Sequence, residues 1–357
     1  MSLEEKLNRL FEGFGYQKFK MSKFEEYDLY ASNKDFLTSS QLITFTDLDG
    51  SLLALKPDIT LSIIKSTFEP RKVYYNEMVY RPKDHHYKEI PQAGVECIGT
   101  IDSYQEAEVI ALAAKALSAV DPNYILRVSD VGYVRTFLEE AKVDETYQKF
   151  ILEALAEKNA DYMKSLVKQG ILNASTGEVL VKLVSLYQPL RSGIKEIRGA
   201  VDSPACNVIL DHLQEVASIL NGFDVLDHIY LDLSLMNSMD YYNGLIFQGA
   251  VSDIPFTVLS GGRYDRLPEK MGKRFGAIGF AVYMDVVETR KKSRLHYDGD
   301  LLILYSEKDS SITLAKVVNH FSAQGWKVRA ERIDTHPEEV RWKRVMRLKE
   351  AKKEAGI

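Results

Sequence analysis

The sequence predicts an α+β protein whose main sheet is largely antiparallel and flanked by helices. Strand-like and helical runs are mixed along the chain without strict alternation, which argues against a parallel α/β sheet. From about residue 132 to 220 the pattern is mainly helical, so we expect a helical insertion there. After a charged linker near residues 290–300, a strand–helix–strand pattern predicts a separate small fragment. We therefore expect a core domain at 1–295 and a C-terminal α/β fragment with a basic tail at 296–357.

Three helices are expected before the insertion. Apolar residues recur at helical spacing in Leu3–Phe14, and the stretch from Pro57 to Lys65 reads as the start of a second helix. Ser103–Glu106 has the form of a capping box, which predicts a third helix from there to about Val120.

The strand candidates are short apolar runs bounded by polar or turn residues. In chain order they are residues 51–55, 73–79, 93–99, 124–128, 228–236, 245–251, 256–259, 276–282, 301–305 and 326–330, with a helix at 311–324. His228–Met236 alternates between apolar and other residues, as a half-buried strand does. Asp47–Gly50 is a tight-turn signal, and the polar, basic Arg81–Glu89 reads as a loop between two strands.

Composition excludes several classes of protein. The 357 residues carry a net charge of −5, which gives no general affinity for phosphate backbones. The two cysteines, Cys97 and Cys206, are too few and too far apart for a disulfide framework or a cysteine-type zinc site. There is no signal-peptide pattern and no apolar run of the roughly 20 residues that a membrane helix needs. We expect a cytoplasmic protein with no membrane association and no metal site.

The C-terminal tail, Arg341–Ile357, is rich in Lys and Arg and reads as a basic amphipathic helix. Such a helix could bind RNA or a protein partner. Charge runs of this kind are usually solvated helix faces, and that interpretation is favoured here.

Four separated motifs carry the functional argument, and they are Leu55–Thr60, Tyr87–Gly99, Asp240–Asn243 and Gly261–Asp265. In this order and spacing they resemble the class II synthetase core of the histidyl-tRNA synthetase family over about residues 1–290. The resemblance implies a class II fold with an antiparallel sheet. It also implies a dimer built around a first motif near Phe24–Leu29, although Ser22 stands where that motif usually has proline.

The second motif places an amide and a carboxylate on one face of a strand, because Gln92 and Glu96 are four residues apart. That pair suits an ammonium group. Asp58 adds a second carboxylate and Thr60 a hydroxyl. The alternative is that Gln92 and Glu96 face solvent on an outer sheet face.

Tyr241 and Tyr242 offer flat walls and phenolic hydroxyls that suit an imidazole ring. In the resembling family the matched positions bind histidine. The expected histidine-binding residues are therefore Asp58, Thr60, Gln92, Glu96, Tyr241 and Tyr242.

In this chain, the half of the site that matches the family's ATP-binding residues has fewer arginines than the family enzymes have. Family enzymes carry three arginines there, and Arg81 matches the first. Asn237 and Val286 stand at the other two positions, so two charged contacts to the adenylation transition state are lost. One such contact is worth on the order of 3 kcal/mol. We expect no catalytic residues and no cofactor, the alternative being compensation by another basic residue.

A histidine pocket with depleted adenylation arginines, and too few residues after Asp300 for a complete anticodon-binding domain, resembles one family specifically. That family is the regulatory subunit of ATP phosphoribosyltransferase, and the resemblance covers nearly the whole chain. It implies a non-catalytic homodimeric core that assembles with the short catalytic subunit into a hetero-octamer, activates it, and transmits feedback inhibition by L-histidine. The alternatives are a divergent histidyl-tRNA synthetase and a synthetase-like sensor of uncharged tRNA. The acidic net charge makes a nucleic-acid partner the weaker expectation.

Overall fold

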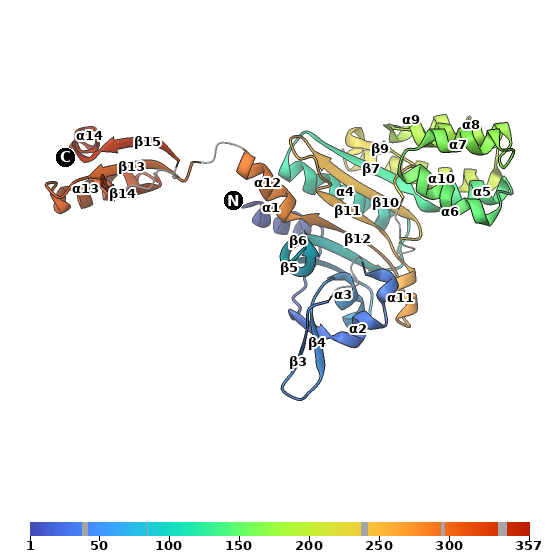
Figure 1. Ribbon diagram of the computed structural model, residues 1–357, viewed down its shortest axis with the longest axis horizontal. Coiled ribbons are helices and arrows are strands. Elements are labelled where there is room, and N and C mark those ends of the chain that lie inside the picture. The colour runs from blue at the N-terminus through green and yellow to red at the C-terminus, as the bar shows by residue number, and fades with distance from the viewer. Residues whose placement is uncertain (38–41, 84, 237–241, 294–296, 335–340) are drawn as a thin grey trace. The chain divides into compact units, whose positions relative to one another are not determined.

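The computed structural model describes residues 1–37, 42–83, 85–236, 242–293, 297–334 and 341–357, with backbone alone at 35 and 289–293. The chain forms two compact units, residues 1–287 and 288–357. Within the described residues, the first unit contains a nine-stranded sheet and a three-stranded one, and the second unit contains a further three-stranded sheet (Figure 1). The predicted α+β fold is confirmed.

The large sheet is antiparallel through its centre. Its strands lie in the order β1 (Gln17–Lys18), β5 (Arg71–Lys83), β6 (His86–Gly99), β12 (Gly276–Tyr283), β11 (Leu259–Arg263), β10 (Leu245–Val251), β7 (Tyr124–Asp130), β9 (Ile229–Leu231) and β8 (Gln188–Pro189). Among the described strands of this large sheet, only the pairs β1–β5 and β7–β9 are parallel. Segments far apart in the sequence therefore become neighbours, which is how one cavity can draw on several motifs.

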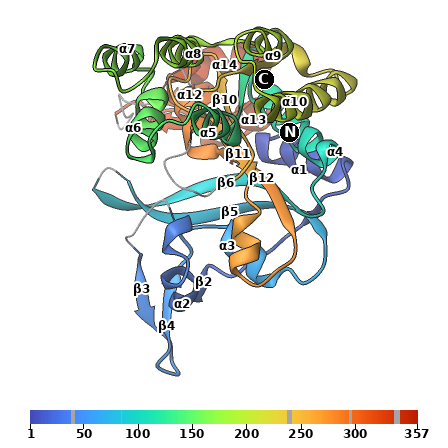
Figure 2. The same cartoon turned by 90° about the vertical axis from the view of Figure 1, so that its right-hand side faces the viewer.

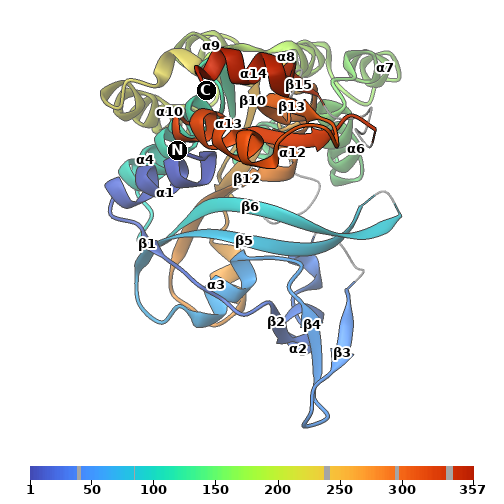
Figure 3. The ribbon, with the colours of Figure 1, turned by 90° about the vertical axis from the view of Figure 1, so that its left-hand side faces the viewer.

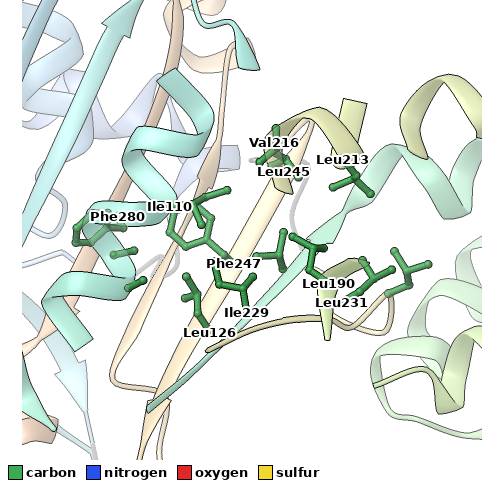
Figure 4. Packing of buried hydrophobic residues seen from close by; sticks show 14 of the residues in the cluster. Ile110, Leu126, Leu190, Leu213, Val216, Ile229, Leu231, Leu245, Phe247 and Phe280 are labelled. Carbon is green, nitrogen blue, oxygen red and sulfur yellow. The ribbon is translucent and has the colours of Figure 1, made fainter. Parts of the chain in front are cut away.

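Helices α1 (Leu3–Gly13), α4 (Ser103–Val120) and α10 (Pro204–Gly222) pack on one side of this sheet. Strand alternation turns Val95, Phe247 and Phe280 to that side, where they share a buried cluster with Ile110 of α4 (Figure 4). The side chain that caps α4 belongs to Asp102, not to the predicted Ser103, because the Asp102 carboxylate accepts the first free backbone N–H groups.

The other side of the sheet packs against a second cluster of buried residues. The elements around it are α2 (Tyr27–Ala31), α3 (Thr60–Ser66), α11 (Arg266–Lys270) and a small sheet of β2 (Phe24–Glu26), β4 (Leu52–Leu55) and β3 (Thr44–Thr46). The β3–β4 hairpin projects from the body of this unit (Figure 2). Its turn lies where Asp47–Gly50 predicted it, with Gly50 at φ +88°.

The helical insertion occupies residues 131–222, close to the predicted 132–220, and joins the sheet at its β9–β8 edge. Its helices are α5 (Val131–Glu140), α6 (Glu145–Ala156), α7 (Ala160–Lys168), α8 (Ala174–Ser185), α9 (Leu190–Arg198) and α10.

The second unit is a parallel sheet in the order β14 (Val328–Arg332), β13 (Gly299–Tyr305), β15 (Trp342–Arg347), with helices α13 (Ser311–Ala323) and α14 (Leu348–Ala355). The prediction of one helix from Arg341 to the end is wrong, because residues 342–347 pair with β13 as a strand before α14 begins. Several tail charges bind acids within this unit: Arg344 lies 2.6 Å from Glu354 and Lys343 2.6 Å from Asp300.

Three further predictions are corrected. The described part of the expected loop Arg81–Glu89 is instead the end of the long β5–β6 hairpin (Figure 3). In its register Arg81 lies opposite Lys88. This part of the hairpin is largely exposed, so polar side chains are compatible with strand pairing. The predicted strand His228–Met236 ends at Leu231, because the Asp232 carboxylate accepts the Ser234 N–H and begins a turn. The strand expected at 256–259 lies instead at 259–263.

Candidate ligand-binding site

A cavity of about 270 Å³ lies on the sheet face opposite α4. Side chains from β5, β6, β12, β11 and β10 line it, together with the first residue of α3 and the segment that precedes it. Small-molecule sites occupy roughly 300–1,000 Å³, so this cavity suits a ligand near the small end of that range.

The structure brings five of the predicted binding residues to this cavity, and they are Asp58, Thr60, Gln92, Glu96 and Tyr242. Gln92 and Glu96 are only 6% and 2% exposed, so the alternative in which they face solvent is wrong. Tyr241 and Asn237 lie outside the described residues.

Val286 lies in α12 (Met284–Ser293), is partly buried, and packs against the main core. The side chain at this position therefore contributes an apolar contact to that core.

Glu96 is held by two hydroxyl groups. Thr60 donates to one carboxylate oxygen at 2.8 Å, and Tyr264 donates to the other. The facing strand has glycine at 279, where a Cβ would collide with this carboxylate. Burial and, to a smaller extent, the nearby Asp58 charge raise the pKa of Glu96 to about 8, while the hydrogen bonds from Tyr264 and Thr60 oppose that rise. A cationic ligand group beside Glu96 would favour its ionised form.

Asp58 is fixed at the start of α3. Its Oδ1 accepts the Leu61 N–H at 2.8 Å, and Arg81 lies 3.4 Å from its Oδ2. The Arg81 Nε also donates to the Pro57 carbonyl. Burial raises the pKa of Asp58, whereas the Arg81 charge opposes that rise. Among the described residues around the cavity, Arg81 alone is cationic, and this pairing commits it to Asp58.

Sequence reasoning missed five polar residues of the cavity, which are Tyr75, Tyr264, Gln248, Ser260 and Tyr283. Tyr264 belongs to the Gly261–Asp265 motif, so the motif itself was the available signal. Ser260 and Tyr283 share a hydrogen bond, and Gln248 is the cross-strand partner of Ser260. No sequence pattern announces these pairings, because they depend on the register of three strands.

The arrangement combines two carboxylates with a row of hydroxyl and amide groups on one sheet face. It can recognise a small ligand that carries both a cationic group and hydrogen-bond acceptors. Within the part of the chain that the structure describes, no group of three or more His, Cys, Asp or Glu side chains could hold a metal ion. No helix of the described segments is both long and apolar enough to cross a membrane.

The sequence model of the histidyl-tRNA synthetase family matches residues 1–287. The chain belongs to this family. Among its relatives in the family, it is 29% identical over 320 residues to the ATP phosphoribosyltransferase regulatory subunit of Thermoanaerobacter pseudethanolicus, covering 85% of this chain and 83% of that protein. It is 27% identical to the protein of the same name from Acetivibrio thermocellus, over 80% and 71% of the two chains. The resemblance inferred from the four motifs is confirmed.

Solved structures of the family agree with the fold. An ATP phosphoribosyltransferase regulatory subunit/histidyl-tRNA synthetase from Bacillus halodurans has a TM-score of 0.73 at 25% identity, covering 97% of this chain and 92% of that one. Histidyl-tRNA synthetase from Nostoc gives 0.71 at 15% identity, over 92% and 81%. A chain of an ATP phosphoribosyl transferase complex from Thermotoga maritima gives 0.64 at 17%, over 79% and 96%. The last two speak for the fold alone, and the predicted class II synthetase-like fold is confirmed.

Proposed function

We propose that this chain is the non-catalytic regulatory subunit of an ATP phosphoribosyltransferase, working in the cytosol. In this proposal it activates the short catalytic subunit and mediates its feedback inhibition by histidine, in the first step of histidine biosynthesis. The observation that carries the proposal is the cavity itself. The cavity offers two carboxylates, Asp58 and Glu96, to an amino acid. Arg81, the cationic side chain in its described lining, is paired with Asp58.

Histidine fits the chemistry of this cavity. Glu96 and Asp58 provide acceptors for its ammonium and imidazole N–H groups, and Gln92 adds an amide. Tyr242 lines the same space and offers a ring face to the imidazole.

The electrostatics argue against adenylation. Lys83, close in sequence to Arg81, lies 2.6 Å from Asp285 at the start of α12, one residue before Val286. The charge of Lys83 is therefore paired with an acid and is not free to bind phosphates. We expect no histidine-dependent exchange of pyrophosphate into ATP. The rival function, a divergent histidyl-tRNA synthetase, requires exchange at a rate typical of synthetases.

The names of the relatives, which are regulatory subunits of ATP phosphoribosyltransferase, support this choice of partner. We propose a homodimeric core that joins catalytic subunits in a hetero-octamer. The test is co-purification with a short catalytic phosphoribosyltransferase subunit, followed by an activity assay with and without histidine. Faster turnover in the complex, slowed by histidine only when this chain is present, supports the proposal. No association and no effect on turnover would contradict it.

A further inference from the structure

Gln248 lies on β10, three strands away from Glu96, and lines the same cavity. At about 4.8 Å per strand this is roughly 14 Å across the sheet. Its Oε1 accepts a hydrogen bond from Arg127 Nη2 at 2.9 Å, and the two residues are cross-strand partners in β10 and β7.

Arg127 is itself held in place by a fully buried acid. Its Nη1 lies 3.3 Å from Asp232, whose carboxylate also meets Lys158 Nζ at 3.2 Å and the Ser234 hydroxyl. The Asp232 side chain has no exposed surface. A buried carboxylate needs its cationic partners, so moving Arg127 away would be costly.

This arrangement decides which end of the Gln248 amide serves the cavity. A guanidinium group has donors only, so it must face the amide oxygen. The Nε2 is then the end of the amide that remains to donate, and Arg127 also polarises it. Beside it, Ser260 and Tyr283 add hydroxyls. The cavity therefore has a polarity: acids at Asp58 and Glu96, and the amide donor of Gln248 three strands away from Glu96.

We propose that Gln248 binds the carboxylate of the amino-acid ligand, with Arg127 as the positioning residue that holds the amide in the donating orientation. The ligand's cationic end then lies at Asp58 and Glu96. This assignment rests on the proposed function in so far as the amino acid is histidine. It makes Gln248 the residue that distinguishes an amino acid from its decarboxylated amine.

The test compares histidine with histamine, which lacks the carboxylate, by calorimetric titration of the full chain. Gln248→Leu should weaken histidine binding about tenfold or more, as expected for the loss of a hydrogen bond to a charged group, and leave histamine affinity unchanged. Gln188→Leu, at an exposed glutamine of β8, is the matched control and should alter neither ligand. Equal losses for both ligands in Gln248→Leu would overturn the assignment.

Two further variants separate binding from folding. Gln248→Glu keeps an oxygen for Arg127 but presents a negative charge to the ligand, so histidine should bind more weakly than to Gln248→Leu. Arg127→Lys retains a donor, so it should bind histidine more tightly than Arg127→Met does. The ratio of affinities between these two variants should be larger for histidine than for histamine. Parental histidine affinity in Gln248→Glu would overturn the proposal. A parent chain that binds no histidine would instead overturn the proposed function, so the two failures are distinguishable.

Discussion

Glu96 is the buried carboxylate that we propose as the partner of a cationic ligand group. Glu96→Ala removes a buried carboxylate that Thr60 and Tyr264 orient, so it should abolish most of the rise in melting temperature that histidine produces. Gln92→Ala should reduce that rise less, since a neutral hydrogen bond is roughly half as strong as a charge-assisted one. Thermal denaturation with and without histidine measures both.

Glu89→Ala is the matched control for these variants, because Glu89 lies on the same strand and is exposed. It should keep the full effect of histidine. If Glu96→Ala binds histidine as tightly as the parent, the cavity is not the histidine site.

The raised pKa of Glu96 predicts a pH dependence of the ligand-free protein. Its value changes from 4.5 in the unfolded chain to about 8 when folded. Between these values the unfolded state loses a proton that the folded state keeps, so the free energy of unfolding falls as pH rises. The slope from this one group is at most about 1.4 kcal/mol per pH unit, and it vanishes above the folded pKa.

Glu96→Gln should remove this contribution. Denaturant unfolding should show the variant gaining stability over the parent, from near pH 5 to near pH 8, by on the order of a few kcal/mol. A stability difference that is the same at both pH values would mean that Glu96 is not held neutral by burial.

Some of these cavity residues could be predicted from the sequence and others could not. The difference is whether a local pattern or a long-range strand pairing places the residue at the cavity. Gln92 and Glu96 share a strand, so alternation alone places them on one face. Asp58 and Thr60 come from a recognisable motif next to a helix start. Gln248 was not predictable, because its role comes from Arg127, 121 residues away in sequence, and from the register of β10 on β7.

At the scale of elements, the small sheet has an apolar face that predicts a contact with a second copy of the chain. The register turns Phe24 and Leu55, and Phe45 and Leu53, to the same side, while Ala54 points into the core. The Phe24 and Phe45 rings lie 5.1 Å apart, and Phe24 is 48% exposed. A cluster of aromatic and aliphatic side chains on one exposed face is typical of an interface.

Phe45→Glu should therefore weaken the homodimer, because it places a carboxylate within an apolar contact. A cost of about 2–3 kcal/mol corresponds to a roughly 30- to 150-fold higher dissociation constant, which sedimentation equilibrium can measure. Thr46→Glu, on the opposite face of the same strand, should leave the dimer intact. Equal effects of the two substitutions would exclude this face as the interface.

Two of the errors in predicting elements share one cause. Hydrophobic pattern reveals an element only where one face is buried and another is not. The tip of the β5–β6 hairpin and strand β15 are both largely exposed and charged, so their patterns indicated a loop and a helix. In both cases pairing with a neighbouring strand determined the structure, and that pairing is a non-local property.

At the scale of the whole molecule, the α+β class, the helical insertion and the separate C-terminal unit were all visible in the sequence. Each leaves a long composition or periodicity signal. The assembly of one cavity from residues 58–60, 92–96 and 242–283 was not visible in periodicity. It became predictable only through the order and spacing of four motifs, since these record a known three-dimensional arrangement.

In the assembled complex, the effects of histidine and of the substrates on each other's binding should be reciprocal. Suppose that histidine slows the catalytic subunit by binding this chain. Linkage then requires that the inhibited complex bind histidine more tightly than the active complex does. The ratio of the two affinities equals the factor by which saturating histidine shifts the equilibrium between the active and the inhibited complex. Substrates that favour the active state should weaken histidine binding to the complex by that factor. Titration of histidine with and without substrates measures it.

Tyr242→Ala should relax this inhibition and leave assembly unchanged, because Tyr242 lines the cavity while the apolar face proposed for the dimer lies on the small sheet. Removing the ring costs contact with the ligand, and we expect a shift of the inhibition curve to at least tenfold higher histidine, which is about 1.4 kcal/mol. The control is the mass of the complex by light scattering, which should match the parent. Unaltered inhibition in each of Asp58→Ala, Glu96→Ala and Tyr242→Ala complexes would place the effector site outside this cavity.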